Sequence, residues 1–393
     1  MTASSAAPAD LAADRARISS LVAAIGSICV VGLASGLTLP LVSLRLAAAH
    51  ASAAVIVTLA ALPALGTIAV SLALAALTRA VGSKALLLLA MLLSCASVLM
   101  LATPYAPLPW MLSRLALGVS AGVLFALGES RILEVSGDQA RGRWTGVYAM
   151  TLTACQFAGP ALLAALGADS RTPIVVAAAM HLVAIALLLR TRWHGSGTAD
   201  SKSLRLRHFA RAALPLAGAV LFFSMFDSAV LSLLPLYGLQ VGLSASLAIL
   251  MVSAVLLGDS ALQVPIGWAA DRFGRRAVHA ACGLLTAAMA LALPLGALAT
   301  PAMWVALFLM GGAAGGLYTL AIVQIGDRYS GGRLVSANAF VGLLWGLGGL
   351  LGPLLAGASM QAFKPHGLLL FVAAGAGTVL LALRWKGRSS GAA

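Results

Sequence analysis

Four ionisable residues lie inside long apolar runs of the sequence, where they could hold a proton or a charged solute. Asp227 and Asp259 stand near the middle of two such runs, and Arg114 and Glu129 stand in a third. A charged side chain at the centre of a membrane helix costs at least about 2.5 kcal/mol on insertion scales, so each one needs a specific reason to be there. We interpret the four as candidate binding groups, with structural hydrogen bonding as the alternative.

The two aspartates are predicted at a similar depth on neighbouring helices. Two carboxylates cannot both be ionised cheaply in a medium of low dielectric constant, and a shared proton near neutral pH is what a proton-coupled carrier needs. We therefore assign Asp227 to a proton or a cation in a central cavity. For Asp259 a functional and a structural role remain equally open. Gln263 follows Asp259 by one helical turn and shares its face.

Arg114 and Glu129 lie on roughly one face of their helix, about 22 Å apart along its axis. Arg114 suits either an anionic group of a substrate or the fixed counter-charge of an acid. Glu129 suits either the cavity or the neighbouring basic cluster at Arg131, and both interpretations stay open. Polar support is expected from three amide side chains, Gln156, Gln324 and Asn338.

The sequence contains no pattern for an enzyme, a cofactor or a metal. His181 and His279 have no second histidine or cysteine at ligand spacing, so we expect no metal site. No Ser-His-Asp, HExxH or P-loop pattern occurs, which argues against catalysis and against ATP as the direct energy source. The four cysteines each lie in an apolar run without a CxxC pair and are interpreted as core residues.

A chain that carries these residues is too apolar to have water as its main solvent. Of its 393 residues, 61% are hydrophobic and 9% are charged, and the mean hydropathy is +1.02. A bilayer takes roughly 20 apolar residues per helix. We predict an all-α membrane protein with twelve transmembrane helices, at residues 18–44, 52–79, 83–103, 107–134, 142–167, 172–190, 212–240, 246–270, 276–299, 302–328, 333–361 and 366–385.

The net charge of +14 is spread in short clusters between the apolar runs, which is typical of membrane topology and not of a nucleic-acid interface. The segments predicted on one side hold nearly all Lys and Arg; the other side has only Arg45, Arg171 and Lys364. Both termini are therefore predicted to be cytoplasmic. We expect a tail at 1–17, a six-helix bundle at 18–190, a cytoplasmic linker at 191–211, a second bundle at 212–385 and a tail at 386–393.

An internal repeat relates the two predicted bundles at an offset of 193 residues. Gly159-Pro160 matches Gly352-Pro353, and the acidic residues Glu134 and Asp327 match at the same offset. The glycines of the fourth and tenth runs also match, Gly118 with Gly311 and Gly122 with Gly315. Six spans fit into this interval, so the halves run parallel, an arrangement known from transporters with a site between the halves.

The sequence resembles the major facilitator superfamily along nearly its whole length. The segment Gly267-x-x-x-Asp271-Arg272-x-Gly274-Arg275-Arg276 is similar to the family's loop motif, of which the first half keeps only Gly82 and Lys84. Arg114-x-x-x-Gly118-x-x-x-Gly122 and Gly348-x-x-x-Gly352-Pro353 resemble two further family motifs. The resemblance implies two six-helix bundles, a cavity lined by the first, fourth, seventh and tenth spans, and a monomer.

The loop motif is interpreted as a cytoplasmic latch. Gly274 permits a turn with positive φ, while Asp271 and Arg275 are placed to bridge to Asp327 or to a neighbouring helix end. The alternative is a solvated basic cluster that only sets topology. The predicted gate comprises Gly267, Asp271, Arg272, Gly274, Arg275, Arg276, Asp327 and Glu134.

Together these features predict a secondary transporter of the bacterial inner membrane that works by alternating access without a cofactor. The candidate binding groups comprise three acids and one base: Asp227, Asp259, Glu129 and Arg114. This excess of negative charge favours a small cationic, zwitterionic or neutral amphipathic substrate. We expect proton-coupled export. The alternatives are proton-coupled uptake of a nutrient by the same residues and, less favoured, a membrane sensor that kept the fold without transport.

Overall fold

The computed structural model describes residues 8–191, 214–295, 300–328 and 331–389, apart from the side chains of some stretches within them. These residues form helices and connecting turns, with no strand among them. The first half contains α1 (Pro8–Ala48), α2 (Ala53–Val81), α3 (Ser83–Met100), α4 (Pro107–Leu166) and α5 (Thr172–Arg190). The second contains α7 (Leu214–Gln240), α8 (Ala245–Phe273), α9 (Arg275–Ala292), the 3-10 turn η1 (Leu293–Leu295), α10 (Pro301–Arg328), α11 (Gly331–Ala362) and α12 (Gly367–Ser389).

The apolar helices lie where the sequence predicts membrane spans. In the described part of the chain, nine stretches are long and apolar enough to cross a bilayer, from Ile18–Ala48 to Phe340–Ala362. Two shorter apolar stretches, Met150–Leu166 and Gly367–Leu383, and the helix α9 occupy the three remaining predicted positions. Within the described residues, each of the twelve expected segments is therefore mostly helical. The predicted linker at 191–211 lies outside the described residues except for Thr191.

The expected break between the fourth and fifth spans is absent, because α4 is helical from Pro107 to Leu166. A straight helix of its 60 residues would be about 90 Å long, roughly three times the hydrocarbon thickness. Its two arms nevertheless lie against the same helix: Gly128 packs on Ile28 of α1, and Gly32 of α1 packs on Leu152. The path of α4 must therefore turn back on itself, and each arm serves as one span.

Glycines lie at the closest helix contacts. This is expected in a membrane, where no hydrophobic effect drives the helices together and small residues let their backbones approach closely. A Cβ at Gly118 of α4 would overlap the backbone of Pro63 in α2, and one at Gly311 of α10 would overlap the backbone of Val255 in α8. Gly118 and Gly311 are a repeat pair, so the sequence repeat corresponds to equivalent helix packing in the two halves.

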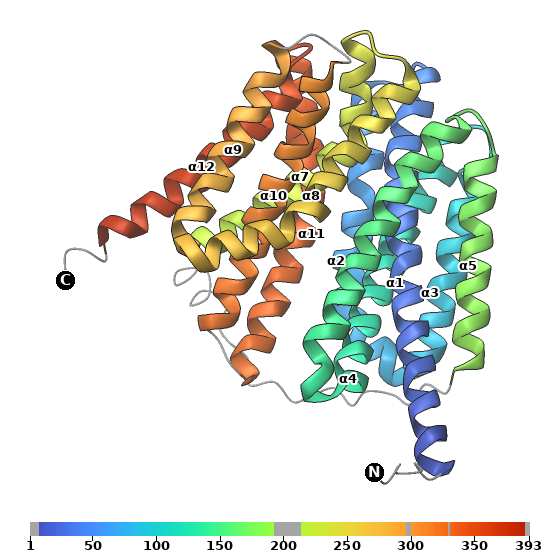
Figure 1. The fold of residues 1–393 in the computed structure, drawn as a ribbon. Coiled ribbons are helices and arrows are strands. Elements are labelled where there is room, and N and C mark those ends of the chain that lie inside the picture. The colour runs from blue at the N-terminus through green and yellow to red at the C-terminus, as the bar shows by residue number, and fades with distance from the viewer. Residues whose placement is uncertain (1–7, 192–213, 296–299, 329–330, 390–393) are drawn as a thin grey trace.

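The two halves touch mainly away from the terminal end of the bundle, meaning the end near Val81, Gly274 and Asp327. The α2–α11 contacts run from Ile68 against Gly346 to Val57 against Gly357, along the part of α2 that is distant from Val81. Figure 1 shows the two groups of helices side by side at the upper end and farther apart toward the lower end, where the N-terminus lies. A pocket of about 510 Å³ lies between α2 and α11 near Val57 and Gln361.

Three basic residues donate to backbone carbonyls near helix ends. Arg45 of α1 donates to the carbonyls of Leu101, Ala168 and Ser170 at 2.7, 2.9 and 3.0 Å. Lys84 donates to Thr191 at 2.6 Å beside the end of α5. Arg276 donates to Leu383 at 3.1 Å near the end of α12, which is the equivalent contact in the second half.

We predict that Arg45→Ala destabilises the N-terminal half by about 2–4 kcal/mol, because three carbonyls lose a charged donor. Thermal unfolding of the purified protein in detergent measures this. The control is Arg171→Ala, which removes the same charge from an exposed position on the same side of the bundle. Equal melting temperatures for the two variants would contradict the clamp assigned to Arg45.

Candidate functional site

Asp227 of α7 lies at a junction between the halves. Its Oδ1 accepts a hydrogen bond at 3.4 Å from Nε2 of Gln156, which belongs to the second arm of α4. Gln156 itself packs closely on Gly36 of α1. The Asp227 side chain is half-buried. The acid of one half is therefore held by an amide of the other, a contact that a relative movement of the halves would change.

Asp259 of α8 ends a short hydrogen-bond chain within the C-terminal half. Nε2 of Gln263 donates to Oδ1 of Asp259 at 2.7 Å, and Oγ1 of Thr319 in α10 donates to Oε1 of Gln263. The four-residue spacing of Asp259 and Gln263 brings them together on one helix face. Gly315 makes room for this group, because a Cβ there would overlap the Asp259 carboxylate.

The carboxylates of Asp227 and Asp259 lie within Coulombic range of each other, on helices that pack together. Two neighbouring carboxylates repel each other in a medium of low dielectric constant. The favoured state is therefore one in which a proton or a bound cation compensates one of the two charges. The pair can therefore bind protons or cations.

Arg114 does not share this location. It is 1% exposed and donates to the carbonyl of Leu59 in α2 and to Oγ1 of Thr38 in α1, each at 3.0 Å. Pro63 explains the first bond: it has no N–H group, so the carbonyl of Leu59 four residues earlier lacks its helical partner. We expected a substrate or an acid as the partner of Arg114, whereas the structure shows it joining α1, α2 and α4 inside the N-terminal half.

Glu129 faces the opposite half. Its side chain is exposed, and it lies within Coulombic range of Tyr318 in α10, as does Asp259. Both interpretations left open by the sequence, the cavity and the basic cluster, stay predictions. The side chains of Glu134 and Asn338 lie outside the described residues.

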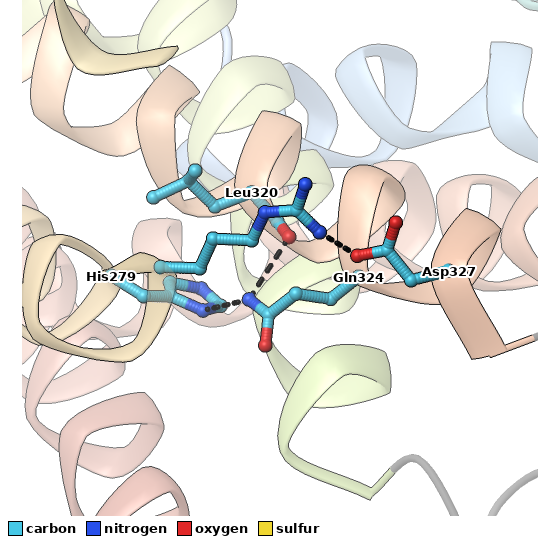
Figure 2. A network of polar contacts seen from close by, with 5 residues as sticks. His279, Leu320, Gln324 and Asp327 are labelled. Carbon is cyan, nitrogen blue, oxygen red and sulfur yellow. Dashed lines mark hydrogen bonds and ion pairs between the residues drawn. The ribbon is translucent and has the colours of Figure 1, made fainter. Parts of the chain in front are cut away.

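Gln324 lies away from the aspartates, at the contact between α9 and α10. Its Nε2 lies 3.1 Å from Nδ1 of His279 and donates to the carbonyl of Leu320 at 3.0 Å (Figure 2). We expected it to support the intramembrane charges, and the structure instead gives it a buried histidine as partner. An ion pair between Arg275 and Asp327 links α9 and α10 one turn farther along (Figure 2).

The residues of the predicted gate differ in their surroundings. Arg275 and Asp327 pair within the C-terminal half, so they brace α9 against α10 and do not themselves bridge the halves. Asp271 is exposed, and Gly274 has a φ of +89° at the turn between α8 and α9. The guanidinium of Arg272 lies 5.6 Å from the Trp268 ring. A Cβ at Gly267 would meet no atom within 4 Å.

Two features of the site escaped the sequence analysis. Thr319 has no motif around it, although its position four residues after Gly315 placed it near the repeat glycines. Tyr318 was not selected either; its ring packs at 5.2 Å from both Phe223 and Trp345. Contacts among α7, α10 and α11 are needed to find this cluster.

The apolar spans and the polar groups between two similar halves define a multi-pass membrane carrier. The model of the Major Facilitator Superfamily matches residues 24–249 and 216–392. The chain is 28% identical over 283 residues to the uncharacterised MFS-type transporter YfkF of Bacillus subtilis (strain 168). The alignment covers 70% of this chain and 71% of the relative. The chain therefore belongs to the major facilitator superfamily of transporters.

Two solved structures show the same fold. One is a bacterial homologue of the human lysosomal transporter Spinster, in an inward-facing and unoccupied conformation, with a TM-score of 0.74 and 15% identity over 94% of each chain. The other is a D-xylose–proton symporter, with a TM-score of 0.69 and 15% identity over 93% of this chain and 96% of the symporter. At this identity the likeness concerns the fold alone.

We predict that Gly315→Ala impairs transport, because the added methyl group must displace the Asp259 carboxylate from its bond with Gln263. Overpacking of this kind costs about 1–3 kcal/mol. The control is Gly326→Ala on the same helix, where a Cβ meets nothing within 4 Å. Thermal unfolding and transport assays in proteoliposomes compare the two. If both variants behaved like wild type, the space at Gly315 would have no bearing on Asp259.

Proposed function

We propose that this protein is a secondary transporter that couples movement of a small cationic, zwitterionic or neutral amphipathic solute to protons. The observation that carries the proposal is the pair Asp227 and Asp259, two carboxylates within Coulombic range inside the membrane-spanning region. A bound proton or a bound cation relieves their repulsion, and only one of the two can do so at a time. Competition of that kind is the physical basis of exchange.

The contact of Asp227 with Gln156 supports alternating access. The two residues come from different halves, so the hydrogen bond between them depends on how the halves are docked. A change in the charge of Asp227 alters the strength of this bond, because ionised acceptors make stronger hydrogen bonds than neutral ones. Binding of a proton is thereby linked to the relative position of the halves.

The charge distribution supports an orientation with the terminal end of the bundle in the cytoplasm, in a bacterial inner membrane. The exceptions on the other side include Arg45, whose guanidinium is occupied by three carbonyls. In this orientation the contacts between α2 and α11 lie toward the outer surface. We assign the working unit to a monomer, because each chain holds both halves and both aspartates.

The direction of transport follows from the order in which the proton and the solute bind. The two intramembrane acids Asp227 and Asp259, together with the exposed Glu129, favour a solute that carries positive charge, and exchange of that solute against protons is export. Uptake with protons uses the same residues and is the second candidate. The sign of the proton movement that the solute induces distinguishes the two.

We predict that Asp227→Asn and Asp259→Asn each abolish substrate-driven proton movement in proteoliposomes. An asparagine side chain is a neutral amide, so it cannot take up and release a proton as a carboxylate does. The measurement uses a panel of cationic, neutral and anionic compounds and a pH-sensitive dye. Asp169→Asn, in an exposed loop, is the control. If protons still moved in both variants at the wild-type rate, the aspartates would have no part in coupling.

The ion pair at the terminal end is a second test. An exposed pair such as Arg275–Asp327 contributes about 0.2–1 kcal/mol, and it holds α9 against α10 at the end of the bundle that we assign to the cytoplasm. We predict that Arg275→Asp and Asp327→Arg each slow transport, and that combining them restores part of the rate. Asp271→Asn should slow cycling while leaving substrate binding intact. Unchanged rates in all four variants would refute a gating role.

A further inference from the structure

Three aromatic rings from three helices form one cluster in the C-terminal half. The rings of Phe223 (α7) and Tyr318 (α10) are stacked with centroids 5.2 Å apart, and Trp345 (α11) lies 5.7 Å from Phe223 and 5.2 Å from Tyr318. Tyr318 and Trp345 meet edge to face, at an interplanar angle of 67°. We call Phe223, Tyr318 and Trp345 the aromatic cluster.

The backbone holds the aromatic cluster in place. Ser224, next to Phe223, donates to the carbonyl of Trp345 at 2.5 Å. Gly348 lets α11 approach α7 so closely that a Cβ there would overlap Ser224. Rings fixed in this way lose little conformational freedom when a ligand binds, which favours affinity.

The cluster adjoins the carboxylates of the proposed coupling site. Phe223 precedes Asp227 by one helical turn. Tyr318 precedes Thr319, which continues the hydrogen-bond chain to Asp259, and Tyr318 lies within Coulombic range of Asp259.

Tyr318 also faces the other half of the protein. It lies within Coulombic range of Glu129, which belongs to α4 of the N-terminal half. Phe223 is 6% exposed, whereas Tyr318 and Trp345 are only partly buried. Tyr318 therefore lies between an acid of each half, and the partly exposed ring of Trp345 packs against it.

Aromatic faces and carboxylates together select one kind of ligand. An organic cation is attracted to the face of a tryptophan or tyrosine ring, more strongly where water is excluded, and its apolar substituents pack on the same rings. Neutral solutes gain only the second contribution, and anions are repelled by the acids. A tightly hydrated inorganic cation gains nothing from the apolar surroundings.

We propose that Tyr318 and Trp345, supported by Phe223, bind the ammonium end of an organic cation beside Asp227 and Asp259. This inference rests on the proposed transport function, because it makes the two aspartates part of the substrate site. It narrows the substrate from any cationic, zwitterionic or neutral compound to quaternary or protonated organic amines.

The test is equilibrium binding of radiolabelled benzyltrimethylammonium to the full chain in lipid nanodiscs, at one pH and without a gradient. This probe keeps its charge at every pH, and neopentylbenzene is its neutral counterpart of nearly the same shape. We expect saturable binding at millimolar concentration or below that neopentylbenzene does not displace. Absence of such binding, or equal competition by neopentylbenzene, would overturn the proposal.

Substitutions then test the rings themselves. Tyr318→Leu and Trp345→Leu keep apolar volume but remove the ring face, and each should weaken binding about tenfold. Tyr318→Phe should retain most of the affinity, and Trp304→Leu, at the distant end of α10, should retain all of it. Thermal unfolding identifies variants that fail to fold. Wild-type affinity in both leucine variants would show that the cluster only packs the helices.

Proton movement separates this inference from the proposed function. Binding of benzyltrimethylammonium through the rings, without any proton movement in proteoliposomes, would support the cation site and refute coupling. Proton movement driven by a neutral compound, in a protein that does not bind the cation, would support coupling and refute the cation site.

Discussion

The cost of placing polar groups in hydrocarbon governs this structure. Every charged side chain in the interior of the bundle must find a partner, since water is not there to solvate it. Arg114 meets this requirement through Nε and Nη1, which donate to a carbonyl that Pro63 leaves without its helical bond and to a threonine hydroxyl, while its buried Nη2 has no partner among the described residues. Asp259 meets it with Gln263, which is itself bound by Thr319. Asp227 depends on Gln156 from the other half. The first two arrangements are internal to a half, while the third is not.

The location of the hydrogen-bond partner distinguishes two kinds of side chain. A partner in the same half stabilises that half, whereas a partner in the other half is lost or changed when the halves move. The contacts of Arg114 lie within the N-terminal half and persist in any docking of the two halves. Those of Asp227 cross between the halves, where the helices also meet through glycines such as Gly346 and Gly357. At these two glycines the side chains of Ile68 and Val57 in α2 fit directly against α11, so the small residues let the two halves pack closely.

Spacing along the chain predicted several parts of the site because those parts are local. Asp259 and Gln263 share a helix face by their spacing alone, and Gly274 was identified as a turn with positive φ from its motif. Where the partner lies on another helix, prediction succeeded only in part. The expected pair of Arg275 and Asp327 is present, whereas Gln324 meets His279 instead of an intramembrane acid. Nothing in one helix indicates which residue of the next one faces it, since several registers bury the same apolar surface.

The sequence by itself determined the membrane environment, the twelve helical segments, the pairing of the halves through the repeat, and the family. These properties depend on the free energy of transferring whole segments into lipid and on residues close together in the chain. Only the tertiary structure decided that Arg114 is a helix clamp, that α4 continues through the expected loop, and that Tyr318 joins Phe223 and Trp345. Those outcomes depend on helix rotation and on backbone approach at single glycines, which segment hydrophobicity does not specify.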